Sequence, residues 1–320
     1  MPLHAFLPSD GANARSASAF RQEVAETNDY VVVVSEADII RATGSRPGTQ
    51  RTLVSDLRRL GVPPAEVVIV HSSLSAIGWV GGGPHAVVLA LEEAIGDDGT
   101  LVMPAHSGAL SEPSQWQNPP VPESWWPIIR AETPAFDPDL TPTRQMGAIV
   151  DCFRTQPGTM RSSHPQLSFA ARGPRAADIT NDHSLEYGLG ERSPLARVYD
   201  LNGYVLLVGV GHANNTSIHL GEYRLDGAGQ KTTTNGAPVT VKGERRWVEF
   251  EDIELDESDF DRLGNDFESE TGAVKIGRIG LAEAKLMSQR SLVDYAVGWM
   301  ERNRGSRAPT EEAGGEAQER

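Results

Sequence analysis

The residues best suited to chemistry lie in the stretch 209–224, which carries two histidines and a glutamate. The apolar run Tyr204–Val210 before it is predicted to form a buried strand. Side chains beyond the carboxyl end of a parallel strand commonly face a site crevice. If a helix begins near Asn215, His219 and Glu222 stand three residues apart on one face. A neighbouring carboxylate fixes the imidazole tautomer and raises its basicity, as a general base for an amine or hydroxyl requires.

Other chemistries find less support in the residues. His212 and the HxxE motif at His219 could be assembled into a metal site, but the HExxH spacing of a zinc protease is missing. Without a G-x-S-x-G elbow, Ser72 and Ser193 lack the setting of a hydrolase nucleophile. Cys152 lies in the apolar stretch IVDCF, which favours a buried structural thiol over a reactive one.

A strand–helix–strand unit is predicted to stand beside this stretch. Its strands are Glu66–Val70 and Thr100–Met103, and its helix is Pro84–Ile95. The loop His71–Gly83 leaves the first strand, and its glycines allow a ligand to approach the backbone closely. The loop has neither the Walker A nor the GxGxxG pattern, so a cofactor cradle and a plain tight turn are both open.

The remaining pattern predicts one α/β domain with a β-rich elaboration. The Pro- and Trp-rich segment Ser111–Pro142 has no regular period and is expected to be a functional loop or a lid. The loops Arg161–Pro165 and Asp182–Arg197 either hold a ligand or simply close turns. Further predicted elements are helices at Thr49–Leu60, Gly147–Phe153, Ser193-Pro194 onward and Leu281–Arg302, strands at Val31–Val34 and Leu167–Ala171, and a hairpin over 231–256 with turn signals at Asn235-Gly236 and Lys242-Gly243.

Composition narrows the class of protein. Of the 320 residues, 39% are hydrophobic and 23% are charged, which is typical of a globular chain. The apolar runs are too short to span a bilayer, no secretory signal is evident, and a single cysteine excludes an intrachain disulfide. These features predict a cytoplasmic protein. The net charge of −15, without a basic cluster, argues against nucleic acid as a partner.

The acidity is concentrated in Glu249–Asp261, which holds eight carboxylates and no lysine or arginine. A solvated, solubilising loop explains such a run. A negative field that attracts a polycationic substrate explains it equally well, and composition alone does not decide.

Five stretches occur in one order along the chain: HSSLSAIGWVGGG, GTLVMP, RSSHPQLSFAA, GERSPLAR and VLLVGVGHANNTSIHLGE. Together they resemble the aminoglycoside 3-N-acetyltransferases, which are unrelated to the GNAT fold, and the resemblance covers about 49–299. It implies a three-layer, mixed-sheet α/β domain with a β-rich elaboration. It also implies transfer of acetyl from acetyl-CoA to the 3-amino group of a 2-deoxystreptamine antibiotic, which confers resistance, with no metal.

The resemblance also implies roles for individual residues. His219 matches the catalytic histidine, and Asp252 is expected beside it, with Glu222 as the local alternative. A backbone N–H of the Ser72-Ser73 turn could stabilise the oxyanion. CoA contacts are expected from Ser72, Ser73, Val80, Gly81, Gly82, Arg161, Ser162 and His164, and antibiotic contacts from Glu249, Glu251, Trp116 and His183.

The expected organisation is an N-terminal extension at 1–45, partly flexible, one acetyltransferase domain at 46–303 and a disordered tail at 304–320. The expected partners are a cationic aminoglycoside and acetyl-CoA, with a homodimer allowed for and neither nucleic acid nor a membrane. Acetylation of a different amine, a metal-assisted hydrolase using His164, His212 and His219, and a module that only sequesters antibiotic are the alternatives.

Overall fold

A computed structural model describes residues 35–117, 119–225 and 231–304. By its contacts the chain divides into Met1–Ser35 and Glu36–Arg320, and only Ser35 of the first unit is described. The second unit, which begins at Glu36, holds the fold, and the boundary predicted at residue 46 stays a prediction. The predicted strand Val31–Val34, the rest of the extension up to residue 34, and the tail beyond residue 304 lie outside the described residues.

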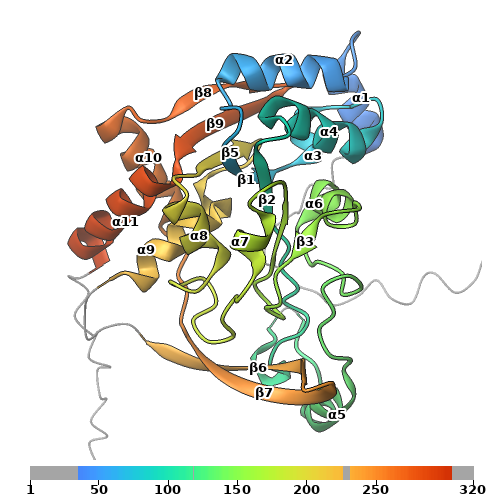
Figure 1. The fold of residues 1–320 in the computed structure, drawn as a ribbon, viewed down its shortest axis with the longest axis vertical. Helices are drawn as coiled ribbons and strands as arrows, with labels where there is room; N and C mark the ends of the chain where they lie inside the picture. The colour runs from blue at the N-terminus through green and yellow to red at the C-terminus, as the bar shows by residue number, and fades with distance from the viewer. Residues whose placement is uncertain (1–34, 118, 226–230, 305–320) are drawn as a thin grey trace, which may run out of the picture. The chain divides into compact units, whose positions relative to one another are not determined.

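A mixed seven-stranded sheet forms the centre of this unit (Figure 1). Strands β1, β2 and β5 run parallel, and the flanking strands β4 and β9 run antiparallel to them. The central strands are almost continuously apolar, because a strand covered on both faces must be buried on both. In order across the sheet the strands are β3 (Met160–Arg161), β4 (Phe169–Arg172), β2 (Thr100–Pro104), β1 (Val67–Ser72), β5 (Tyr204–Val208), β9 (Ala282–Ser288) and β8 (Lys275–Ile279).

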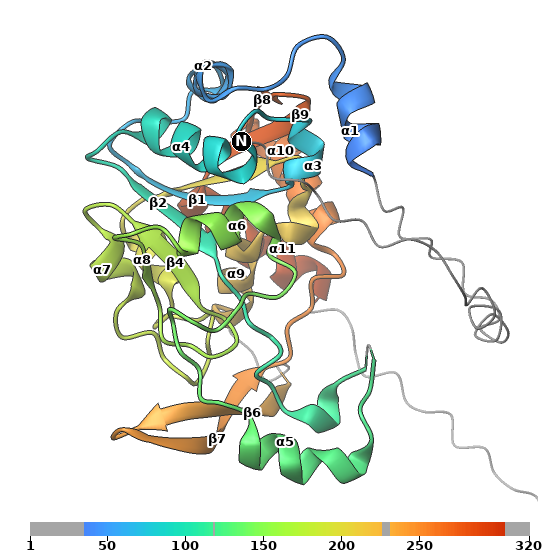
Figure 2. The same ribbon diagram turned by 90° about the vertical axis from the view of Figure 1, so that its right-hand side faces the viewer.

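Helices cover both faces of the sheet and complete the three layers that were predicted (Figures 1 and 2). One face packs against α2 (Gln50–Leu60), α4 (Gly83–Ile95) and α6 (Gly147–Arg154). The opposite face carries α7 (Ala176–Thr180), α8 (Pro194–Asp200), α9 (His219–Tyr223), α10 (Phe260–Thr271) and α11 (Gln289–Arg304). No helix in the described ranges is long and apolar enough to cross a membrane.

The helix ends follow the local signals in the sequence. Thr49 caps α2 through a reciprocal capping box with Thr52, and Gly61 ends the helix in a left-handed conformation with φ 88°. Ser193 caps α8 through its side chain, with Pro194 in the first turn. These local predictions are confirmed.

The β-rich elaboration is a two-stranded hairpin of β6 (Thr232–Val241) and β7 (Glu244–Ile253). Its turn lies at Lys242-Gly243, as predicted, but the second turn expected at Asn235-Gly236 is wrong. Gly236 lies inside β6, where a Cβ atom would come within 2.7 Å of the Trp247 ring. The glycine therefore allows the indole to cross the strand.

The segment predicted to lack regular structure packs against this hairpin, and both lie away from the central sheet (Figure 2). It contains the short helix α5 (Trp126–Glu132) and the 3-10 turns η1 (Pro113–Gln115) and η2 (Glu123–Trp125). The Arg245 guanidinium donates to the carbonyl of Thr133, and the Phe136 N–H donates to the carbonyl of Pro238. The loop is therefore an ordered layer built on β6 and β7.

The expected closing helix at Leu281–Arg302 is wrong in its first third. Residues Ala282–Ser288 form β9, which pairs with β5 on one side and β8 on the other. Only from Gln289 does the chain become helical, as α11. The hairpin with the preceding strand β8 and the pairing with the distant strand β5 override the helical preference of this segment.

Candidate active site

The carboxyl ends of the three parallel strands bring distant residues to one edge of the sheet. His71 is the next-to-last residue of β1, and His106 follows the end of β2 by two residues. After β5 the chain forms two 3-10 turns, η3 (His212–Asn214) and η4 (Thr216–Ile218), and then enters α9 at His219. The burial of both His71 and His106 lowers their pKa, and nearby His219 lowers it further. The parallel strands therefore bring His71, His106 and the segment that carries His219 to the same edge of the sheet.

His219 and Glu222 face one another across one turn, as their spacing predicted. Nδ1 of His219 lies 2.6 Å from Oε2 of Glu222. A carboxylate can only accept, so Nδ1 carries the proton and donates it. Nε2 makes no hydrogen bond within the described residues and is the nitrogen available to a substrate. The His219 side chain is 14% exposed and the Glu222 side chain 4%.

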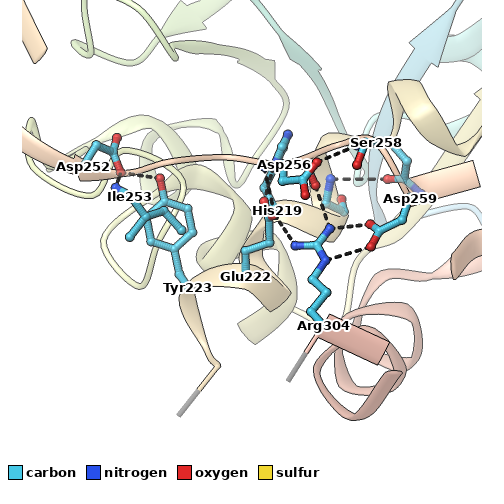
Figure 3. Close-up of polar contacts among 11 residues, drawn as sticks. His219, Glu222, Tyr223, Asp252, Ile253, Asp256, Ser258, Asp259 and Arg304 are labelled. Carbon is cyan, nitrogen blue, oxygen red and sulfur yellow. Dashed lines mark hydrogen bonds and ion pairs between the residues drawn. The ribbon is translucent and has the colours of Figure 1, made fainter. Parts of the chain in front are cut away.

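Glu222 is itself held from the C-terminal end of the domain (Figure 3). Its Oε1 lies 2.6 Å from the guanidinium of Arg304, the last residue of α11, and accepts from the backbone N–H of Asp256 at 3.1 Å. Arg304 also pairs with Asp259, and the Glu222 and Asp259 hydrogen bonds raise its pKa although burial lowers it. The Arg304 guanidinium and the Asp256 N–H therefore hold the Glu222 carboxylate in place beside Nδ1 of His219.

The expected contact between Asp252 and His219 is wrong. Asp252 is buried on β7, and its Oδ1 accepts from the Tyr223 hydroxyl at 2.5 Å (Figure 3). Its Oδ2 accepts from the backbone N–H of Gly188. Burial, followed by the charge of Asp252, raises the pKa of Tyr223, so the phenol stays protonated and donates. Of the two candidate carboxylates, Glu222 orients the histidine.

Known proteins resemble the chain over most of its length. A family model described as aminoglycoside 3-N-acetyltransferase matches residues 69–301. The aminoglycoside N(3')-acetyltransferase-like protein YokD of Bacillus subtilis is 45% identical over 80% of this chain and 94% of its own. Aminoglycoside N(3)-acetyltransferase VII of Streptomyces paromomycinus is 34% identical over 81% of this chain and 93% of its own.

The chain belongs to the aminoglycoside 3-N-acetyltransferase family.

Solved structures of the family share this fold. The crystal structure of YokD superposes with a TM-score of 0.82 at 43% identity, covering 85% of this chain and all of that one. AAC-VIa bound to sisomicin gives 0.72 at 32% identity, over 80% and 98% of the two chains. AAC-IIIb in a binary complex with CoASH gives 0.73 at 28% identity, over 82% and 100%.

In this acetyltransferase the loop predicted to hold CoA is fixed by backbone hydrogen bonds. Ser73 caps the short helix α3 (Leu74–Ile77) with its side chain, and its N–H donates to the carbonyl of Val208 at 2.9 Å. The Ser73 N–H is thus already used, which is evidence against the oxyanion role suggested for it. Ser72 is the last residue of β1, in register with Val208.

The glycines of this loop lie against the start of the described chain. Val80 forms an isolated bridge with Gly48, and the Gly81 N–H donates to the Gly48 carbonyl. Gly82 begins α4 with a left-handed φ of 91°, which an L side chain rarely adopts. Contact of Val80, Gly81 and Gly82 with CoA stays a prediction.

The other predicted CoA contacts are engaged within the protein. Ser162 and His164 are each 1% exposed. His164 Nδ1 accepts from the Leu167 N–H, and its Nε2 donates to the Leu185 carbonyl. The Arg161 guanidinium donates to the carbonyls of Ala105 and Thr141, and burial lowers its pKa to about 10. This geometry favours loop positioning by all three residues, and direct contact with CoA stays a prediction.

The residues predicted to bind antibiotic occupy different environments. His183 is buried, with Nδ1 2.9 Å from the Ser162 hydroxyl and Nε2 2.6 Å from the Gly188 carbonyl. Glu249 and Glu251 are exposed on one face of β7, whereas Phe250 and Asp252 on the other face are buried. Trp116 is partly buried, and its indole N–H donates to Ser111. Their contact with substrate stays a prediction.

The acidic run Glu249–Asp261 contains both carboxylates that accept hydrogen bonds within the protein and carboxylates that are exposed to solvent. Asp252, Asp259 and Asp261 accept internal hydrogen bonds. Glu249, Glu251, Glu254 and Glu257 are exposed and supply the negative field at this surface.

His106 and Arg304 are the site residues that sequence reasoning did not single out. His71 directly follows the apolar run EVVIV, and His106 follows TLVMP by two residues, so the repeated strand–histidine pattern was a usable signal. Nothing near Arg304 in the sequence indicates its contact with Glu222, 82 residues away. His164, His212 and His219, named for the metal-assisted alternative, belong to no metal-binding cluster in the described part of the chain.

Proposed function

We propose that this acetyltransferase transfers the acetyl group of acetyl-CoA to the 3-amino group of a 2-deoxystreptamine aminoglycoside, with His219 as the general base, and so confers resistance. The observation that carries the proposal is the contact between Nδ1 of His219 and Glu222, which leaves Nε2 of His219 for a substrate. The chain that carries this pair is a member of the acetyltransferase family. Relatives described as bound to CoASH and to sisomicin support the two substrate classes.

The chemistry requires a base because an aminoglycoside amine is largely protonated at neutral pH. The ammonium first loses one proton to solvent, and Nε2 of His219 takes a second proton as the neutral amine nitrogen attacks the thioester carbon. Glu222 keeps the proton on Nδ1 and stabilises the imidazolium that forms. His219 then returns the proton to the departing thiolate, so the products are the amide and CoASH, and no covalent acyl-enzyme is needed.

The charge of the protein suits this substrate. Aminoglycosides are polycations, and a net charge of −15 raises their local concentration near an acidic surface. Glu249 and Glu251 are the predicted contacts on the hairpin, and both are exposed.

A thiol-release assay with acetyl-CoA and a panel of gentamicin, tobramycin and kanamycin tests the proposal. The wild type should release CoASH with at least one of them, and His219→Ala should not, while its circular dichroism spectrum and Tm stay close to wild type. Activity with other amines but none on this panel would reject the aminoglycoside assignment and keep the acetyltransferase. Unchanged antibiotic susceptibility of a bacterium expressing the protein would reject the resistance role.

A further inference from the structure

Five histidines gather on the α9 face of the sheet, and hydrogen bonds hold three of them. His164 and His183 use both ring nitrogens within the protein. His219 uses Nδ1 for Glu222. His71 and His106 differ, since no hydrogen bond to either ring occurs within the described ranges.

His71 and His106 are held at this edge by their strands. His71 follows Val67 and Ile69 at alternate positions of β1, so it faces the same helix layer as they do. The ring of His106 stands edge-on to Phe169 of β4, whose side chain belongs to the core on the same face, with 5.3 Å between centroids. His71 is only 8% exposed, and Nε2 of each ring is buried without a partner in the described part of the chain.

An unpaired buried nitrogen is costly. Leaving such a group unsatisfied costs about 1–3 kcal/mol, so native proteins usually give it a partner. Each Nε2 thus keeps a hydrogen-bonding capacity that no described protein group uses. Two unpaired imidazoles beside the proposed base therefore indicate a ligand with hydrogen-bonding atoms.

Both rings are neutral in the working pH range. Burial, and then the nearby His219, lowers the pKa of each to about 3. A neutral imidazole can donate an N–H hydrogen bond but does not compete with His219 for the amine proton. Acetyl transfer needs such donors, because negative charge develops on the carbonyl oxygen.

We propose that His71 and His106 form the oxyanion site, each donating an N–H to the acetyl carbonyl oxygen; this deepens the proposed function and rests on it. As the amine nitrogen bonds to the carbonyl carbon, the C=O π pair moves onto the oxygen between the two rings. His219 holds the amine proton. The pair then returns to re-form C=O as the C–S bond breaks, and the thiolate takes the proton from His219.

The test compares turnover with binding in His71→Ala and His106→Ala. Each should lower kcat for acetyl-CoA about 10²- to 10³-fold, the usual loss for one oxyanion donor. The Kd for CoASH, which has no acetyl carbonyl, should stay within about twofold of wild type. That measurement also shows that the variant is folded.

Conservative variants separate hydrogen bonding from packing. Asn and Gln place a neutral N–H near the positions of Nδ1 and Nε2, so His71→Asn or His71→Gln should recover at least tenfold over His71→Ala. The pH profile of kcat/KM should keep its shape in these variants, because His71 does not titrate there. His212→Gln, outside this site, is the matched control and should keep kcat.

Three results overturn the inference. They are a kcat within about threefold of wild type in both alanine variants, a loss of CoASH affinity that matches the loss of turnover, and equal activity in the alanine and amide variants. A wild type that releases no CoASH with the aminoglycosides or with any other amine tested rejects the proposed function and this inference together. An active wild type with active alanine variants rejects the inference alone.

Discussion

Two histidine–carboxylate pairs follow strand β5, and they are built in opposite ways. In the first, His219 is 14% exposed and its partner Glu222 4%; in the second, His212 is 1% exposed and Glu268 16%. Each carboxylate also meets a cation, which is Arg304 for Glu222 and Lys285 for Glu268. The same three kinds of group thus occur twice.

The two pairs differ in which ring nitrogen of the histidine is left without a hydrogen bond and in how that nitrogen is enclosed. His212 binds Glu268 through Nε2 at 2.8 Å, and its Nδ1 is buried without a partner in the described ranges. A Cβ atom on Gly264 would come within 2.0 Å of the His212 ring, so α10 closes over it. Burial lowers the pKa of His212 although Glu268 raises it. The proposed base role therefore suits His219, whose Nε2 has no partner among the described residues and whose side chain is partly exposed, and not the enclosed His212.

The largest contrast is expected on removing each imidazole. His219→Ala should lower kcat by about 10⁴-fold, because the amine loses its proton acceptor. His212→Ala should leave kcat within a few-fold and lower the free energy of unfolding by about 2 kcal/mol, because it opens a cavity and deprives Glu268 of a partner. Thiol release and urea unfolding measure the two effects. Equal losses of kcat would mean that the two pairs do not differ in role.

The carboxylates should repeat this contrast less strongly. Glu222→Gln is expected to lower kcat by about 10²-fold with little change in KM, since an amide can donate to Nδ1 and so move the proton to Nε2. Glu268→Gln should weaken the contact with Lys285 and affect only stability. Steady-state kinetics measure the expected loss of kcat in Glu222→Gln, and Tm values measure the expected loss of stability in Glu268→Gln. A Glu222→Gln enzyme with wild-type kcat would exclude Glu222 as the orienting group.

Asp252→Asn tests the rejected alternative directly. Because Asp252 contacts Tyr223 and Gly188 rather than His219, the variant should change kcat less than tenfold. Its main effect should be on the Tm, through the weaker hydrogen bond from Tyr223. If Asp252→Asn and Glu222→Gln lower kcat equally, both carboxylates act on the base.

The smallest expected effect is on acid stability. The folded protein holds the pKa of His212 below its ordinary value of 6.5, so the unfolded chain binds a proton first as the pH falls. His212 therefore adds to stability above pH 6.5 and removes up to about 1.4 kcal/mol per pH unit below it. His183, with a pKa of about 4, acts with the same sign. Between pH 6.5 and 5.5, the free energy of unfolding measured in urea should fall less for His212→Gln than for the wild type. The same dependence on pH in both proteins would contradict this.

Local patterns were read correctly where neighbouring residues decide the structure. The caps of α2 and α8 and the β1–α4–β2 unit depend on contacts within a few residues or one short loop. The segment at 282–288 was read as helix because its amphipathic pattern is ambiguous over so short a length. Its strand state comes from the hairpin with β8 and from pairing with β5, and no local window contains β5.

By itself, the sequence predicted that His219 and Glu222 lie on one helix face, because residues three apart on a helix are neighbours. The tertiary structure alone decided that Glu222 rather than Asp252 is the partner. It also brought Arg304 from the end of α11 and placed His71 and His106 beside the base. The physical reason is that these contacts join segments whose distance depends on the whole sheet, and no spacing along the chain encodes it.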